Sequence, residues 1–322
     1  MLDAILPVLP PSIRDVIAAL PEEVRQRVEE IRIRENRPLE VVTAEGTGFV
    51  ATGGRWGTRP ERAYVPDRED CTKLLNLISQ HSLYALEEEL RRGYVTVDGG
   101  HRIGLAGKVV VENGKVKHLR DVTGFNIRLA RQVKGTGKAL IPYVFGPDHV
   151  ENVLIVSPPQ CGKTTLLRDL ARIASVGERG VKPRKVGIVD ERSEIAGCLR
   201  GVPQHDVGPR TDVLDACPKS EGMMMMIRSM SPEILVVDEI GRKEDSDAVY
   251  EAVFAGVNLF VTAHGRSLDE ICRRPGLTGL IREGVFTRVV LLSRRLRPGT
   301  IEGIYDSSLK RVDRERSVRA RC

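Results

Sequence analysis

The spacing of hydrophobic residues changes character near residue 150, and this change predicts two domains. In the first part, helical and strand patterns are mixed. Segment 12–20 carries apolar residues on one helical face, with Ser12 and Asp15 at the spacing of a capping box. Asp67 opens a second helical pattern, whose apolar stripe continues to Leu90 and ends before Gly93. Strand patterns lie at residues 31–33, 94–97, 102–111 and 126–130, with a hairpin turn at Asn113-Gly114. We therefore expect a smaller α+β domain over residues 1–145.

From residue 146 onward, short apolar runs alternate with helical patterns. The strand patterns lie at residues 152–156, 186–189, 234–237 and 259–263. The helical patterns lie at residues 163–174, 223–230 and 248–255. Alternation of this kind predicts a parallel sheet between helices, here closed by a hairpin within residues 288–305. We expect this α/β domain to cover residues 146–322.

Composition narrows the classes of protein. The chain has 322 residues, of which 41% are hydrophobic and 29% charged, which is typical of a globular protein and excludes a disordered one. No apolar run is long enough to span a membrane. The six cysteines include no CxxC pair, so no zinc site is expected and a reducing cytoplasm is favoured.

The net charge and the aromatic content indicate which binding partners the protein could have. The formal charge is +6, and segment 310–322 contributes six basic and two acidic residues to it. A basic tail suits an acidic partner, a lipid surface or simple solvation. Aromatic residues make up only 4% of the chain, with Trp56 the single tryptophan. Because single-strand nucleic-acid modules depend on aromatic stacking, we do not expect nucleic acid as a partner.

A phosphate-binding loop is the strongest motif. An apolar strand leads into nine residues that precede a helix with one apolar face: Ser157, Pro158, Pro159, Gln160, Cys161, Gly162, Lys163, Thr164 and Thr165. In such a loop, backbone N–H groups at a helix N-terminus bind phosphate, and the lysine reaches the β- and γ-phosphates of ATP. The Thr164 hydroxyl is then a Mg²⁺ ligand. Ser157 replaces the usual first glycine, which predicts a small cost in backbone freedom.

Three further strand ends carry polar residues suited to the same reaction. The run 234–237 ends in Asp238 and Glu239, which we interpret as the Mg²⁺-binding aspartate and the general base for the attacking water. Run 186–189 ends in Asp190 and Glu191, the latter a second candidate for the base, and run 259–263 precedes His264. Because ligands bind at the carboxyl ends of parallel strands, we expect these groups to meet in one crevice.

This order of motifs resembles the type II and type IV secretion-ATPase branch of the RecA-like/AAA-type P-loop ATPases. The matching segments are residues 157–164, 189–194, 235–239 and 262–264. A narrower resemblance, to sporulation proteins of endospore-forming bacteria, is carried by longer stretches. These are GFNIRLAR (124–131), PPQCGKTTLLRDL (158–170), DERSEIAG (190–197), residues 210–233 and DEIGRKED (238–245).

The resemblance implies a RecA-like domain that hydrolyses ATP with Mg²⁺ and assembles with itself into a ring, a homohexamer. It further implies a cytoplasmic protein, at the inner face of a membrane, that energises a channel between mother cell and forespore through membrane-protein partners. By the same analogy Arg128 and Arg131, and secondarily Arg102, are candidates to contact the phosphates. Two alternatives stay open: a nucleic-acid-binding ATPase of this fold, and a nucleotide-gated scaffold without turnover.

Overall fold

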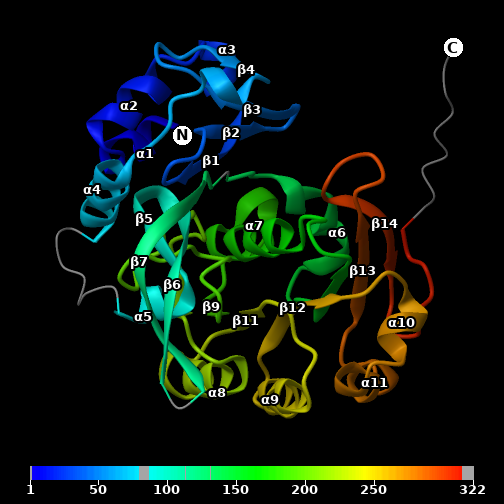
Figure 1. Cartoon of the computed structure of the whole chain (residues 1–322). Helices are drawn as coiled ribbons and strands as arrows, with labels where there is room; N and C mark the ends of the chain where they lie inside the picture. Colours follow the sequence, from blue (N-terminus) through cyan, green and yellow to red (C-terminus); the bar gives the residue numbers. More distant parts are fainter. Residues whose placement is uncertain (1, 80–86, 113, 131, 314–322) are drawn as a thin grey trace, which may run out of the picture. The chain divides into compact units, whose positions relative to one another are not determined.

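The computed structural model describes residues 2–79, 87–112, 114–130 and 132–313 (Figure 1). The chain divides into two compact units, Met1–Arg131 and Gln132–Cys322. Residues 132–145, which the sequence placed in the first domain, thus belong to the second unit. The reason is local: the Gly137 N–H donates to the Asp169 carboxylate at 2.7 Å, and Lys134 forms an ion pair with Asp206 at 2.6 Å.

The first unit is built on a seven-stranded sheet whose pairings are all antiparallel, in the order β4-β3-β2-β1-β7-β6-β5. Its strands are β1 (Val28–Arg34), β2 (Glu40–Thr43), β3 (Gly46–Val50), β4 (Trp56–Gly57), β5 (Tyr94–Val97), β6 (His101–Glu112) and β7 (Lys115–Arg128). Its α-helices are α1 (Leu2–Ile5), α2 (Pro11–Ala18), α3 (Glu22–Arg25), α4 (Arg68–Ile78) and α5 (Glu87–Arg92). The mixed α+β character expected of this region is present.

Helices α4 and α2 of the first unit begin in different ways. Asp67 caps α4: its carboxylate accepts the Asp70 N–H at 2.8 Å, and Asp70 returns the bond, as a capping box requires. The cap predicted at Ser12 is wrong. Helix α2 begins at Pro11, whose fixed φ suits a first helical position, and the Ser12 hydroxyl donates to Asp70 instead. Asn113, predicted in the hairpin turn, lies outside the described residues.

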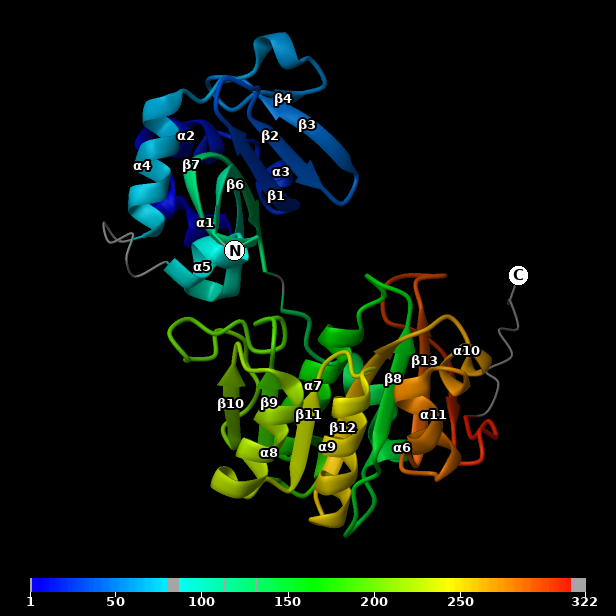
Figure 2. The same ribbon diagram turned by 60° about the horizontal axis from the view of Figure 1, so that its bottom comes forward.

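The second unit contains a seven-stranded sheet in the order β10-β9-β11-β12-β8-β13-β14. Every pairing in it is parallel except that of β14 with β13 (Figure 2). The strands are β8 (Val153–Ser157), β9 (Val186–Asp190), β10 (Thr211–Asp215), β11 (Ile234–Val237), β12 (Asn258–His264), β13 (Arg288–Ser293) and β14 (Thr300–Tyr305). The α-helices are α6 (Ile141–Val144), α7 (Lys163–Val176), α8 (Lys219–Met230), α9 (Lys243–Phe254), α10 (Leu268–Cys272) and α11 (Pro275–Arg282).

Both faces of this parallel sheet are covered by helices. Figure 1 shows α7 on one face and α8, α9 and α11 on the other. The central strands β8, β9 and β11 are buried at every position, and successive residues point to opposite faces. On β8, for example, Ile155 packs in the core with α7, whereas Leu154 packs in the core with α9 and α11. The carboxyl ends of β8, β9, β11 and β12 consequently meet at one edge.

The helices of both units were compared with the length and hydropathy that a membrane span requires. Within the ranges that the structure describes, no helix is both long and apolar enough to cross a bilayer.

Candidate functional site

The loop after β8 leads directly into the 14-residue helix α7. The first turn of any helix directs N–H groups that have no intrahelical partner toward a ligand, and the helix dipole adds partial positive charge there. Two loop residues adopt left-handed backbone, Gln160 (φ 59°) and Gly162 (φ 83°). Ser157 is fully buried as the last residue of β8 and is not among the left-handed residues, so the expected cost of lacking glycine there does not arise.

The hairpin of β13 and β14 contacts the phosphate-binding loop. The Gly299 N–H, at the β13–β14 turn, donates to the Cys161 carbonyl at 2.9 Å. A Cβ added at Gly162 would lie only 3.1 Å from the Gly299 nitrogen. Glycine at 162 therefore permits both the left-handed backbone and the close approach of the hairpin.

Lys163 begins α7, and its ammonium group is enclosed. Only 5% of the residue is exposed, and Nζ lies 3.3 Å from the carbonyl oxygens of both Ser157 and Pro158. It also lies 3.1 Å from Nδ1 of His264. Burial lowers the pKa of Lys163, while the nearby carboxylates of Asp238 and Glu239 act in the opposite direction.

His264 connects this lysine to Glu239. An ammonium group only donates hydrogen bonds, so Nδ1 of His264 accepts from Lys163 and its proton resides on Nε2. That Nε2 lies 2.8 Å from Oε1 of Glu239. The imidazole of His264, at the end of β12, thus links Lys163 at the start of α7 to Glu239, which follows β11, so the ends of these strands converge as expected.

Asp238 is held between two threonines. Its Oδ2 accepts from the Thr164 hydroxyl at 2.7 Å, and its Oδ1 accepts from the buried Thr262 hydroxyl. Thr164 lies on α7 and Thr262 on β12, so two elements fix the carboxylate that follows a third, β11. Thr262 Oγ1 also accepts the Glu239 N–H at 2.8 Å.

These donors fit a magnesium ion completed by nucleotide phosphate and water. Mg²⁺ prefers hard oxygen ligands and is bound through one or two carboxylates together with substrate phosphates. Thr164 and Asp238 place a hydroxyl and a carboxylate oxygen 2.7 Å apart beside the phosphate loop. Within the described residues there is no cluster of three or more histidine, cysteine or acidic residues that could hold a metal by itself.

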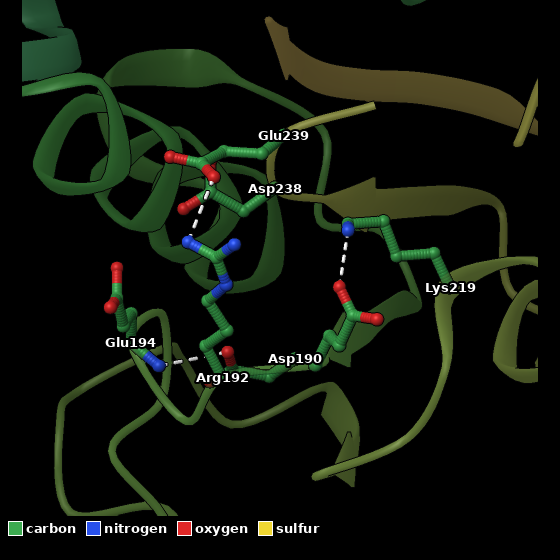
Figure 3. Close-up of a pocket in the computed structure, with 7 residues that line it drawn as sticks. Asp190, Arg192, Glu194, Lys219, Asp238 and Glu239 are labelled. Atoms are coloured by element: carbon green, nitrogen blue, oxygen red, sulfur yellow. Dashed lines mark hydrogen bonds and ion pairs between the residues drawn. The ribbon is translucent and has the colours of Figure 1, made fainter. Parts of the chain in front are cut away.

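Glu239 has an unusual backbone and a defined side-chain position. Its φ of 56° is left-handed, a conformation that costs a non-glycine residue about 1–3 kcal/mol. The N–H bond to Thr262 helps to hold it there. Its second carboxylate oxygen, Oε2, pairs with Arg192 at 3.2 Å, as Figure 3 shows. Cationic and N–H donors therefore fix the carboxylate from two sides.

The two acidic residues at the end of β9, Asp190 and Glu191, have different partners. Asp190 is 1% exposed and accepts the N–H groups of Glu194, Ile195 and Ala196, each at 2.9 Å. Burial nevertheless raises the pKa of Asp190 to about 6, because desolvation outweighs these hydrogen bonds. Asp190 therefore shapes the loop that follows β9.

Glu191 instead pairs with Lys219, at the start of α8. Both residues line a pocket with Asp190, Arg192, Glu194, Asp238 and Glu239. Figure 3 shows Asp238, Glu239 and Arg192 on one side of it and Lys219 on the other. The pocket brings the second acidic strand end beside the first.

Two of the arginines expected to contact phosphate, Arg128 and Arg102, have partners within the first unit. Arg128 ends β7, is well exposed and pairs with Glu30 of β1 at 3.3 Å. The guanidinium of Arg102 lies 3.5 Å from the centre of the Tyr94 ring. Arg131 lies outside the described residues.

Four contributors to the site were not identified from the sequence: Thr262, Lys219, Arg192 and Gly299. Thr262 lies within the segment 262–264 that was matched around His264. A polar residue in an otherwise apolar strand was the feature that could have identified it. Arg192 likewise stood within the matched segment 189–194, whereas Lys219 and Gly299 act through contacts with residues far away in sequence, which no local pattern indicates.

The sequence and the fold are similar to those of known proteins. Residues 2–312 match the family described as "Sporulation stage III, protein AA". The stage III sporulation protein AA of Bacillus subtilis (strain 168) is 51% identical over 318 residues, covering 99% of both chains. The protein SEEDLING PLASTID DEVELOPMENT 1 of Arabidopsis thaliana is 27% identical over 284 residues, which is 87% of this chain and 36% of that protein.

Two solved structures share the fold at low sequence identity. The Legionella pneumophila ATPase DotB aligns with a TM-score of 0.53 and 14% identity, covering 93% of this chain and 78% of that one. The pilus retraction motor PilT, solved with bound ADP, aligns with a TM-score of 0.55 and 15% identity, covering 84% and 76%. The chain has the RecA-like fold of the P-loop secretion ATPases, and it belongs to the sporulation stage III protein AA family.

Proposed function

We propose that the protein is a Mg²⁺-dependent ATPase whose site lies at the carboxyl ends of β8, β9, β11 and β12. One observation carries this proposal: Asp238 is hydrogen-bonded both to Thr164, at the start of the phosphate-loop helix, and to Thr262, whose hydroxyl also holds the Glu239 backbone. The groups for binding phosphate, holding a metal and activating water are thus connected through single side chains.

Each group has a proposed task. Backbone N–H groups of residues 157–165 and Lys163 bind the phosphates, and Thr164 and Asp238 hold Mg²⁺, Asp238 through water. The ion supplies positive charge against the phosphate oxygens. Glu239 takes a proton from water as the water oxygen bonds to the γ-phosphorus and ADP departs. Glu191 is the alternative base.

His264 and Arg192 orient the carboxylate of Glu239. His264 donates to one carboxylate oxygen and contacts Lys163, so it orients the base relative to the phosphate-binding lysine. Arg192 pairs with the other oxygen from an exposed position. With the arginine side exposed to solvent, an ion pair of this kind contributes about 1 kcal/mol.

We further propose that the chain works as a ring motor, a homohexamer, that drives a sporulation channel built from membrane proteins. The protein would act in the cytoplasm, at the inner face of the membrane. Membership of a sporulation family and the fold shared with a pilus retraction motor support this. Arg128 and Arg131 are proposed to contribute to the phosphates from the first unit. The exposed pairing of Arg128 with Glu30 is weak enough to be exchanged for a phosphate contact.

The proposal is tested by sizing the purified full chain with ADP, with MgATP and without nucleotide, beside an assay of phosphate release. We expect MgATP to promote a ring and the wild-type chain to release phosphate. Glu239→Gln should retain the ring with MgATP while releasing phosphate far more slowly, because an amide accepts no proton from water. Ring formation without measurable turnover in the wild type would instead identify a nucleotide-gated scaffold.

A further inference from the structure

The first unit contains a pocket that the proposed ATPase does not use. It lies around the β3–β4 turn and the segment that follows β4, and its volume is about 680 Å³. Its walls include Arg55, Trp56, Arg59 and Arg62. A volume of this size is within the range of pockets that bind ligands.

The aromatic wall of this pocket is rigidly seated. Trp56 pairs with Val50 in the β3–β4 ladder, and its indole lies across Gly48 of β3. A Cβ at Gly48 would come within 2.3 Å of the indole nitrogen, so only glycine allows this position. The residue is nevertheless 36% exposed. An apolar platform is therefore held open to solvent by the backbone beneath it.

The turn that carries the first arginine is also fixed. Ala51 N–H donates to the Arg55 carbonyl at 2.8 Å, and Gly54 N–H donates to the Ala51 carbonyl at 3.0 Å. Gly54 is left-handed (φ 76°), and a Cβ there would lie 2.0 Å from the Ala19 carbonyl oxygen. The turn thus packs against the end of α2, which preorganises Arg55 beside the indole.

Arg55, Arg59 and Arg62 have no acidic partner close by within the described part of the chain. All are exposed. Among the residues that the structure describes, none of the three forms an ion pair or hydrogen bond through its side chain. Segment 51–63 contains a single acidic residue, Glu61, against these three cations. The pocket therefore presents unneutralised guanidinium groups around an apolar ring.

The form of the pocket favours a peptide over other anions. Seven of the ten lining residues are exposed, so the pocket is an open docking surface. β4 is the outermost strand on this side of the sheet and pairs only with β3 (Figure 2). An edge strand offers backbone groups to an extended chain. Single-stranded nucleic acid binds through successive exposed stacking platforms, whereas of the two aromatic residues that line this pocket only Trp56 is exposed and Phe49 is half-buried.

We propose that this surface, formed by Arg55, Trp56, Arg59 and Arg62, docks an acidic segment of a partner protein. Carboxylates of the segment pair with the planar guanidinium groups, and an apolar side chain between them packs on the indole. The surface lies in the first unit, and the proposal does not depend on ATP hydrolysis.

Trp56 provides the test, because it is the only tryptophan in the chain and reports on this surface alone. The full-length protein is titrated with a short glutamate-rich peptide that carries one central leucine, and the tryptophan emission is followed. We expect a saturable change that weakens as salt is raised. Replacing Arg55, Arg59 and Arg62 together by Gln should weaken binding about tenfold or more.

Controls make the result specific. Arg228→Gln removes one exposed cation from α8 in the second unit and should leave peptide binding unchanged. Arg59→Gln alone, a single surface change, covers the case in which the triple variant does not fold. A peptide with glutamine in place of glutamate should not bind. Equal response to both peptides, or no response to the acidic one, would overturn the proposal. Tighter, arginine-dependent binding of single-stranded DNA of equal charge would also overturn it, in favour of nucleic acid.

Discussion

Replacement of Thr262 by valine tests whether one hydroxyl organises the proposed catalytic carboxylates. Valine keeps the β-branched shape on the buried strand β12 and replaces the hydroxyl with a methyl group, which makes no hydrogen bond. Two interactions disappear: the bond from the Glu239 N–H, at 2.8 Å, and the bond to the Asp238 carboxylate. A neutral hydrogen bond contributes about 1 kcal/mol and one to a charged group about 1.5–3 kcal/mol. We expect the free energy of unfolding to fall by about 3 kcal/mol.

The effect on turnover should be larger than the effect on nucleotide binding. Glu239 holds its left-handed backbone partly through the lost bond, so its carboxylate is expected to shift. A displacement of about 1 Å costs a reaction rate about 100-fold. Lys163 and the phosphate loop keep their own contacts, so the Kd for MgATP should change by only a few-fold.

The assay compares Thr262→Val with Thr262→Ser, which restores the hydroxyl. Phosphate release at saturating MgATP gives kcat, titration with a fluorescent ATP analogue gives Kd, and denaturant unfolding gives stability. The serine variant should recover most of the activity. Wild-type kcat in the valine variant would refute the organising role of Thr262, as would an equal loss in both variants.

Three further predictions concern single residues. Lys163→Ala should weaken MgATP binding by about 10- to 100-fold in a direct titration, because a charge-assisted contact to phosphate is lost; unchanged affinity would contradict the site. At least one of Arg128→Ala and Arg131→Ala should lose most ATPase activity at an unaltered melting temperature; full activity in both would exclude the first unit from catalysis. The folded pKa of Asp190, about 6, lies above its unfolded value, so this group stabilises the fold below about pH 4 and loses that contribution as pH rises through 6. Denaturant unfolding should therefore show the wild-type advantage over Asp190→Asn shrinking by up to about 3 kcal/mol between pH 4 and pH 7, and a constant difference would contradict it.

The parallel sheet was predictable because its strands are buried on both faces. Such strands appear in the sequence as continuous apolar runs, and 234–237 coincides with β11. The strand β10 was not predicted, since it is only partly buried and carries two aspartates. In the first unit, β2 and β3 were also missed. The helical pattern from Asp67 was expected to continue to Leu90, yet α4 ends at Ile78 and α5 is a separate helix.

The site was predictable where a residue's position in a motif determines its place in space. Lys163 and Asp238 each follow or end a buried strand, so parallel pairing alone brings them together. Side-chain partners are a different matter. That Arg128 meets Glu30 depends on the register of β7 against β1, in which these two residues are paired. The contact of Lys219 with Glu191 depends on how α8 packs, which periodicity does not specify.

The most direct test of the proposed ATPase is the rate of phosphate release by the purified full chain with MgATP, measured beside Glu239→Gln under the same conditions. We expect turnover in the wild type, dependent on Mg²⁺, and a loss of at least about 100-fold in the variant with ATP binding retained. Equal turnover in both proteins would contradict the role of Glu239. No turnover in the wild-type chain, as a monomer or as a ring, would contradict the central claim itself.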